Sequence, residues 1–162
     1  MSDESAEFRS FFDDLLPTVL RVAQRMTGDR ASAEDVAAEA FARAFARWRR
    51  VGTLSYREGW VLRVASNLAV DLARRRARVL RTVSTDSADG ADSVDLRMTL
   101  RPSLARLSRA QRQAVVLRYV ADMSENEVAA AMHIRPGTVK SHLHRATQAL
   151  RTDLGVNLEE VS

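Results

Sequence analysis

Residues 124–151, SENEVAAAMHIRPGTVKSHLHRATQALR, decide the fold expected for the second half of the chain. Ser124 followed by Glu127 predicts a capping box that begins a helix, because each side chain can bond the backbone N–H of the other residue. The pair Arg135-Pro136 predicts the end of that helix, since a residue before proline is pushed out of the helical region. Pro136 can also open the next helix, where its missing N–H costs nothing. The stretch therefore predicts two helices joined by a tight turn.

The second of these helices has two different faces. Its apolar residues recur at intervals of four, three and four and should pack along one side: Val139, Leu143, Ala146 and Leu150. The other side and its edges carry small, hydroxyl, amide and basic groups: Gly137, Thr138, Lys140, Ser141, His144, Arg145 and Gln148. Such groups suit close approach to phosphates and base edges. We therefore expect a helix-turn-helix that reads the major groove of DNA, in preference to the solvated face of an ordinary helical bundle.

The composition of the chain excludes several other classes of protein. The chain has 162 residues, enough for one ordinary domain or two small ones, and no cysteine, which excludes disulfides and thiolate metal sites. No apolar run is long enough to span a bilayer, and the acidic start MSDESAEFRS lacks a signal-peptide core. We therefore expect a cytoplasmic protein without membrane contact.

A change of composition predicts two domains. Residues 84–95, STDSADGADSVD, carry four aspartates and almost no apolar surface, so we expect an acidic flexible linker over 84–98. Eight of the nine aromatic residues precede it. No strand pattern is present. The expected fold is all-α, with one small helical domain at 1–83 and a second, containing the helix-turn-helix, at 99–158.

Three helices are expected in the first domain, at 8–27, 33–49 and 60–78. The first should be bent by Pro17 or begin there. Ser32 should cap the second helix, whose apolar side, including Phe45, should be buried. The charged side of this second helix is interpreted from spacing alone as a solvated face.

The third helix of that domain, within WVLRVASNLAVDLARRRAR at 60–78, carries a polar and basic stripe. Four residues of this stripe project in similar directions: Arg63, Asn67, Arg74 and Arg78. Asparagine is unfavourable inside a helix, so an exposed Asn67 is expected to bond a group outside its domain. Nucleic acid is the favoured partner. The alternative is a plain helix surface whose final arginines suit the helix dipole.

Catalytic and metal chemistry is not expected. The six glycines are scattered, so the chain has no phosphate-binding loop or dinucleotide motif. His142 and His144 are two residues apart on a helix and point in directions too different to share a metal. No nucleophile, base and orienting group can be assembled. We therefore expect no enzyme, no catalytic residue, no metal, no cofactor and no small-molecule substrate.

Four segments together resemble bacterial RNA polymerase sigma factors of the extracytoplasmic-function (ECF) type, in the sigma-70 family. They are residues 27–29 with 33–35, 60–76, 107–119 and 137–141. The resemblance extends from about Phe11 to Leu154. It implies two helical domains, sigma regions 2 and 4, with core RNA polymerase and promoter DNA as partners, and it permits an anti-sigma protein as a further partner.

The resemblance also implies roles for individual residues. It implies that the single-stranded -10 element is contacted by Arg63, Ser66, Asn67, Arg74 and Arg75. Tyr56 would form one side of the pocket for a flipped base. It implies that the -35 element is contacted by Thr138, Lys140, Ser141, His144 and Arg145, and that Arg112 binds a phosphate. For docking on RNA polymerase it implies Asp35, Glu39, Arg43 and Arg47.

The function expected is transcription initiation, in which the chain binds core RNA polymerase and directs it to promoters by reading -35 duplex and -10 single-stranded DNA. The alternative is a stand-alone helix-turn-helix transcriptional regulator. Such a regulator would need a ligand pocket, a receiver site or a dimer seam in the first domain, which instead offers the stripe around Asn67. An enzyme would be revealed by turnover without polymerase.

Overall fold

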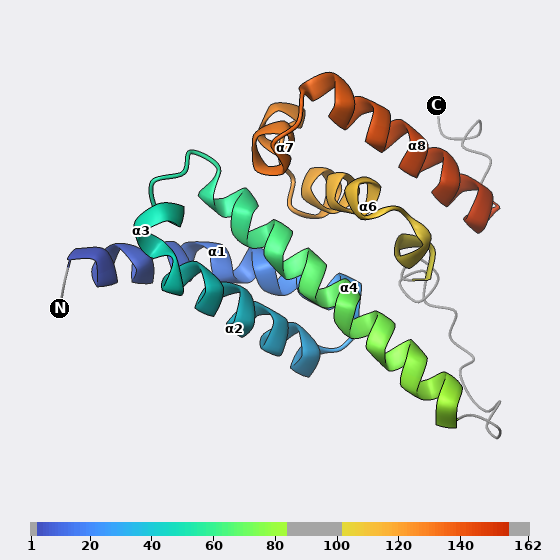
Figure 1. The fold of residues 1–162 in the computed structure, drawn as a ribbon, viewed down its shortest axis with the longest axis horizontal. Coiled ribbons are helices and arrows are strands. Elements are labelled where there is room, and N and C mark those ends of the chain that lie inside the picture. Colours follow the sequence, from blue (N-terminus) through green and yellow to red (C-terminus); the bar gives the residue numbers. More distant parts are fainter. Residues whose placement is uncertain (1–2, 84–101, 156–162) are drawn as a thin grey trace.

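The structure is a computed structural model that describes residues 3–83 and 102–155 (Figure 1). Every regular element in these ranges is helical and none is a strand, which confirms the all-α prediction. The expected linker at 84–98 lies outside the described residues, and so do the exact domain boundaries. The helices of the first half are α1 (Asp3–Thr27), α2 (Arg30–Ala46), α3 (Trp48–Val51) and α4 (Arg57–Val83). Those of the second half are α6 (Arg109–Val115), the π-helical turn η1 (Val116–Val120), α7 (Glu125–Met132) and α8 (Pro136–Leu154), preceded by a helical turn at 102–106.

The turn between α1 and α2 differs from the sequence-based prediction. Gly28 takes the left-handed φ of 85° that favours glycine, and this allows the chain to leave α1. Asp29 then caps α2, because its Oδ1 accepts the backbone N–H of Ser32 at 2.8 Å. The prediction that Ser32 is the cap is therefore wrong, and Ser32 is instead a buried residue of the first turn.

Two further predictions for the first half are corrected. Pro17 lies inside α1, which begins at Asp3, so Pro17 does not mark the start of that helix. The expected single helix at 33–49 is broken at Arg47, where φ is -119° and ψ is 20°, and α3 follows as a separate turn. The break turns Trp48 into the core while Phe45, expected to be buried, is 56% exposed.

The helix ends in the second half follow the predicted chemistry. The Ser124 Oγ accepts the Glu127 N–H at 3.2 Å, and the Glu127 Oε2 accepts the Ser124 N–H at 2.7 Å, which confirms the capping box. Pro136 lies at the start of α8 as predicted. A second capping box, between Ser108 and Gln111, begins α6. These caps satisfy N–H groups that have no partner within their own helices.

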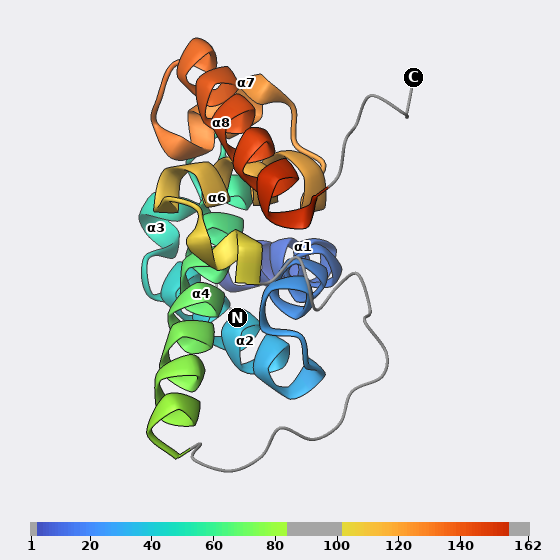
Figure 2. The ribbon, with the colours of Figure 1, turned by 90° about the vertical axis from the view of Figure 1, so that its right-hand side faces the viewer.

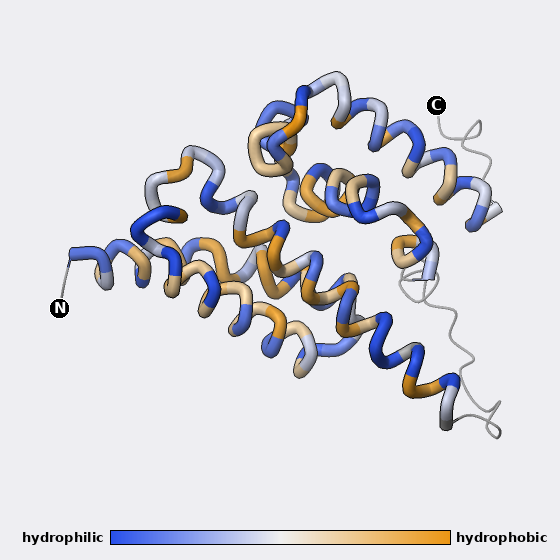
Figure 3. The backbone as a smooth tube through the Cα atoms, viewed as in Figure 1, coloured by the Kyte–Doolittle hydropathy of each residue, from blue (hydrophilic) through white to orange (hydrophobic). Residues whose placement is uncertain are grey.

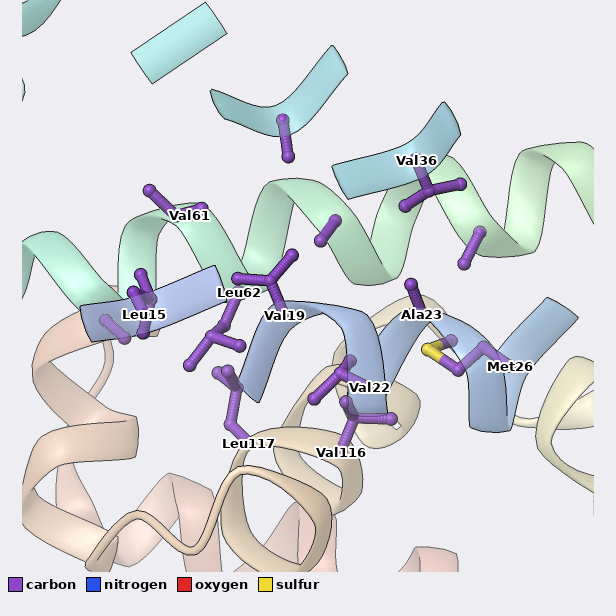
Figure 4. Close-up of a cluster of buried hydrophobic side chains, with 14 of the residues drawn as sticks. Leu15, Val19, Val22, Ala23, Met26, Val36, Val61, Leu62, Val116 and Leu117 are labelled. Carbon is purple, nitrogen blue, oxygen red and sulfur yellow. The ribbon is translucent and has the colours of Figure 1, made fainter. Parts of the chain in front are cut away.

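The two halves share one hydrophobic core. Figure 1 and Figure 2 show α6 between α4 and α8, and Figure 3 shows hydrophobic residues gathered in the middle of the molecule. In the close-up, Val116 and Leu117 of η1 lie against Val22 of α1 and Leu62 of α4 (Figure 4). Val116 and Leu117 are fully buried. The second half therefore packs directly on the α1–α4 face of the first.

Replacing Leu117 by alanine should destabilise the whole chain. Removal of a fully buried leucine side chain loses its transfer free energy and leaves a cavity, so Leu117→Ala should lower the free energy of unfolding by about 2–5 kcal/mol. Urea unfolding followed by circular dichroism measures the change. Leu80→Ala is the control, because Leu80 is 63% exposed and its loss should change stability by less than about 0.5 kcal/mol. Equal effects of the two substitutions would contradict this account of the core.

Candidate nucleic-acid interface

The outer face of α8 presents the residues predicted to contact duplex DNA. Val139, Leu143 and Ala146 are buried against the rest of the second half, as their spacing predicts. Five residues of the opposite face are exposed: Thr138, Lys140, Ser141, His144 and Arg145. Since α6 lies on the inner side of α8, this face is turned away from the first half (Figure 1).

Most polar groups on this face are available for an external partner. Within the described part of the chain, His144 and Arg145 have no hydrogen bond or ion pair. Lys140 lies 3.8 Å from the Glu125 carboxylate, a long and exposed pair that contributes little. The Ser141 hydroxyl donates to the Gly137 carbonyl at 3.2 Å and keeps acceptor capacity. The face therefore combines two cationic side chains, an imidazole and hydroxyls, and cationic and hydroxyl groups can contact phosphates and base edges.

The stripe on α4 is in a different situation, because the second half covers its first part. The Asn67 Oδ1 accepts a hydrogen bond from the Gln113 Nε2 at 2.6 Å and another from the Arg109 Nε at 3.3 Å. The Arg63 Nη1 donates to the Ala131 carbonyl of α7 at 2.9 Å. The expectation that Asn67 bonds a group outside its domain is confirmed. The expectation that it is exposed is wrong, since the second half supplies the partners.

Two more residues assigned to the -10 contact have internal roles in this arrangement. Ser66 is 1% exposed, and its hydroxyl donates to the Arg63 carbonyl at 2.9 Å within α4. The Tyr56 hydroxyl lies 3.0 Å from the His133 Nε2, and the two rings are nearly perpendicular. Ser66 therefore does not face outward, and Tyr56 contacts the second half.

The last turns of α4 form a basic surface. Arg74 and Arg75 are exposed, and neither has a hydrogen bond or ion pair among the residues that the structure describes. Arg76 instead binds within the first half, where its Nη1 donates to the Asp29 carboxylate at 2.7 Å and its Nη2 donates to the Ser32 hydroxyl. An open cavity of about 780 Å³ lies between these turns and the turn at 102–106. Its walls include five arginines: Arg74, Arg76, Arg78, Arg81 and Arg106.

The position of Arg112 differs from the one expected for a phosphate contact. Its side chain is 3% exposed and donates to the carbonyls of Leu104 and Leu107 at 3.4 and 3.2 Å. Burial, and secondarily the charge of Arg74, lowers the pKa of the Arg112 guanidinium. In this arrangement Arg112 holds the turn at 102–106 against α6 and does not face solvent. The implied phosphate contact of Arg112 is therefore not available here.

The charged residues of α2 form a separate exposed surface. Asp35, Glu39, Arg43 and Arg47 are all exposed, and the Arg43 Nε donates to the Glu39 carboxylate at 2.7 Å. The exposed ring of Phe45 belongs to the same helix and packs on Phe8 with a centroid separation of 4.9 Å. The sequence did not predict that Phe45 is exposed, because apolar spacing cannot distinguish an aromatic residue inside the core from one at its edge.

The described residues contain no group of three or more histidine, cysteine, aspartate or glutamate side chains able to hold a metal ion. None of the helices in the described ranges is both long enough and apolar enough to cross a membrane.

Comparison with known proteins gives matches in both halves. Residues 11–79 match sigma-70 region 2, and residues 97–150 match sigma-70 region 4. The ECF RNA polymerase sigma factor SigL of Mycobacterium tuberculosis is 34% identical over 161 residues, covering 93% of this chain and 90% of the relative. The RNA polymerase sigma-E factor of Streptomyces coelicolor is 34% identical over 157 residues, covering 93% and 88%.

A solved structure has the same fold. It is the co-crystal structure of the sigma factor RpoE in complex with the anti-sigma factor NepR from Bartonella quintana. The TM-score is 0.61 with 23% sequence identity, and the alignment covers 93% of this chain and 98% of the other.

The Asp29–Arg76 contact should be visible in the titration of Asp29. The Ser32 backbone N–H and then the Arg76 guanidinium lower the pKa of Asp29 from 3.8 to about 2. Because the folded pKa is lowered, the stability from this group is present above about pH 3.8 and lost as the pH falls toward 2. Arg76→Ala should raise the pKa of Asp29 part of the way back, since the Ser32 N–H remains.

Carboxyl-carbon NMR titration of Asp29 provides the measurement. Arg75→Ala is a matched control, because it removes the same charge from the neighbouring residue, which makes no contact with Asp29. An Asp29 pKa that is unchanged in Arg76→Ala would show that the ion pair does not form.

Proposed function

Because the chain belongs to the ECF sigma factors of the sigma-70 family, we propose that it reads promoter DNA with two separate surfaces while bound to core RNA polymerase. The family relationship confirms the resemblance found in the sequence. A sigma factor directs RNA polymerase and carries out no covalent chemistry of its own. The site of action proposed is the cytoplasm, where transcription takes place.

The outer face of α8 is proposed to read the -35 element as duplex. This assignment is carried by one observation: a complete polar face on α8 is exposed while its apolar face is buried. Arg145 and His144 have no described partner, so binding DNA breaks no internal contact at these positions. Arg145 and Lys140 can approach phosphates or guanine edges, and Thr138 and Ser141 can bond either.

The α4 stripe is proposed to hold the single-stranded -10 element. The amide of Asn67 can hydrogen-bond the edge of an unstacked base, and Tyr56 can form one side of the pocket that holds this base. Arg63 lies one helical turn before Asn67. The exposed Arg74 and Arg75 further along α4 can neutralise phosphates of the same strand. Use of this surface requires that the second half move away from Asn67 and Arg63.

The exposed charges of α2 are proposed to dock on core RNA polymerase. Asp35, Glu39, Arg43 and Arg47 are exposed on α2, which lies on the far side of the first half from α8 (Figure 1), so polymerase and -35 DNA can bind at the same time. Phe45 adds an apolar group on the same helix. Exposed aromatic residues are enriched at protein interfaces, so Phe45 can anchor the charged contacts around it.

Run-off transcription with purified core RNA polymerase and a library of promoters tests this function. The chain should redirect core polymerase to a subset of promoters that share two sequence elements. A chain that binds duplex DNA tightly alone and never redirects polymerase would instead be a stand-alone regulator. The family relationship favours the sigma function.

The RpoE structure from Bartonella quintana holds that sigma factor in complex with an anti-sigma factor. We extend the proposal to an anti-sigma partner for this chain as well. Co-purification from the native cell, followed by inhibition of the run-off assay by the captured protein, would identify it.

Arg145→Ala should weaken binding of the holoenzyme to -35 duplex DNA. Loss of one base-edge or phosphate contact by arginine costs about 1–3 kcal/mol, which corresponds to a loss of about 5- to 150-fold. Arg151→Ala is the matched control, because it removes the same charge from the last turn of the same helix, beyond the residues proposed to contact DNA. Fluorescence anisotropy with a -35 duplex selected in the run-off library gives the affinities. Equal losses of affinity in Arg145→Ala and Arg151→Ala would indicate a non-specific effect of charge.

Asn67→Ala should impair promoter opening while binding to core polymerase remains nearly unchanged. Gln113→Ala removes the same internal hydrogen bond but keeps the Asn67 amide, so this control variant should open promoters at least as well as the parent chain. Permanganate reactivity of unpaired thymines in the -10 region reports opening, and native gel shift reports polymerase binding. Equal defects in the two variants would show that Asn67 acts only through its contact with the second half.

A further inference from the structure

The cavity between the last turns of α4 and the turn at 102–106 has the size and composition of a ligand site. Its volume is about 780 Å³, within the range of about 300–1,000 Å³ that is typical of sites for small molecules. The end of α1 closes one side through Met26 and Thr27. Among the described residues that line the cavity are five arginines and no aspartate or glutamate. This composition favours an anion as the occupant.

Three of the arginines are available to a ligand. Arg74 and Arg78 are exposed, and neither side chain has a hydrogen bond or ion pair within the ranges 3–83 and 102–155. Arg106, on the turn at 102–106, is 71% exposed and lies 3.3 Å from the Asp153 carboxylate, an exposed pair that contributes little. Guanidinium groups from two separate elements can therefore bind one ligand between them.

The guanidinium of Arg112 behind the cavity is an independent indication of an anion. It lines a recess of about 20 Å³ that shares part of its wall with the cavity. Arg112 is 3% exposed and donates to two carbonyls, but no described carboxylate lies within ion-pair distance of it. Burial and then the charge of Arg74 lower the pKa of Arg112, and the smaller effect of Asp71 opposes them. Since a buried charge is costly unless it is compensated, an anion in the cavity would balance this group of cations.

The shape of the site distinguishes it from the proposed DNA surfaces. Arg75, next to Arg74, is exposed but is not among the residues that line the cavity. The end of α4 therefore has an outer basic side and a second basic side that faces a hollow. A nucleic-acid strand runs along an open groove, whereas a hollow with cations on more than one wall suits a compact ligand. Guanidinium groups bind phosphates with paired hydrogen bonds, which makes phosphate the favoured anion.

The apolar part of the lining indicates that the ligand is larger than a phosphate group. Met26, Leu80 and Pro102 contribute apolar side chains to the wall, and Leu80 is 63% exposed. An inorganic phosphate makes no use of apolar surface. A nucleotide base can pack on apolar side chains or stack on the plane of a guanidinium group. The lining therefore favours a nucleotide over inorganic phosphate.

We propose that this cavity binds a nucleoside diphosphate or triphosphate, with the phosphates on Arg74, Arg78 and Arg106 and the nucleoside against Leu80 and its apolar neighbours. Binding of this ligand does not depend on the proposed function. A consequence for promoter opening does rest on it, because Arg74 is also proposed to neutralise phosphates of the -10 strand. The ligand and the DNA strand would then compete for this side chain.

Isothermal titration calorimetry of the full chain with ADP tests the site. Magnesium is left out, because the metal would neutralise the phosphates that the arginines bind. One ADP should bind per chain. Adenosine lacks the charge and should give no heat of binding, and pyrophosphate lacks the nucleoside and should bind more weakly than ADP.

Substitutions locate the site. Arg78→Ala should weaken ADP binding by about 10- to 150-fold, as expected for the loss of a hydrogen bond between charged groups. Arg25→Ala is the matched control, because it removes the same charge from the exposed last turn of α1 without changing the lining; its effect should be less than about twofold. Leu80→Ala should weaken binding of ADP and leave binding of pyrophosphate unchanged. Circular dichroism checks that the variants fold.

Three results of the calorimetry would overturn the proposal. Absence of binding up to about 1 mM ADP would show that the cavity is not a ligand site. Equal losses in Arg78→Ala and Arg25→Ala would indicate general attraction of anions to a basic surface. Pyrophosphate that binds as tightly as ADP, with no effect of Leu80→Ala, would exclude a nucleotide. None of these measurements involves polymerase or promoter DNA, so they do not bear on the proposed function.

The competition with DNA has its own test. Polymerase cannot incorporate ADP, so ADP can be added to the holoenzyme and a promoter without starting transcription. It should lower the permanganate reactivity of the -10 thymines with the parent chain and have no effect with Arg78→Ala. If ADP binds the chain but opening is equal with and without it, the competition does not occur. Failure to open promoters in the absence of ADP would instead count against the proposed function.

Discussion

The arrangement of the molecule depends on the burial of Val116 and Leu117 of η1 against α1 and α4. Apolar side chains that are fully removed from water give the contact its free energy, because burial is favourable in proportion to area. With η1 in this position, α6 lies along α4 and brings Gln113 and Arg109 to Asn67. The same packing turns the outer face of α8 away from the first half. One apolar contact therefore sets the accessibility of both proposed DNA surfaces.

Local hydrogen bonds set the ends of the helices that carry these surfaces. Asp29, Ser108 and Ser124 satisfy the unpaired N–H groups at the starts of α2, α6 and α7. Arg76 connects the start of α2 to the last turns of α4 through Asp29. Together with the buried apolar contacts between α2 and α4, this ion pair sets the position of the polar stripe relative to α2, the helix proposed to dock on polymerase. Movement between the two halves leaves this part of the first half intact.

Sequence patterns predicted the helices well where local chemistry alone decides the structure. The capping box at Ser124, the proline start of α8 and the buried side of α8 depend on residues within a few turns of one another. The cap of α2 was misplaced because Asp29 and Ser32 are both good capping residues, and only the left-handed Gly28 decides between them. The break at Arg47 has no glycine or proline to mark it, and with it the exposure of Phe45 was missed.

The sequence by itself determined the all-helical class, the polar face of α8, the stripe on α4 and, through four segments in register, the sigma-factor family. Each of these is a property of one helix or of residue types at fixed spacing. Only the tertiary structure decided that Asn67, Arg63 and Tyr56 contact the second half and that Arg112 is buried. Helical periodicity shows which side of a helix is polar. It does not show which distant residue covers that side, because such contacts depend on how the halves pack.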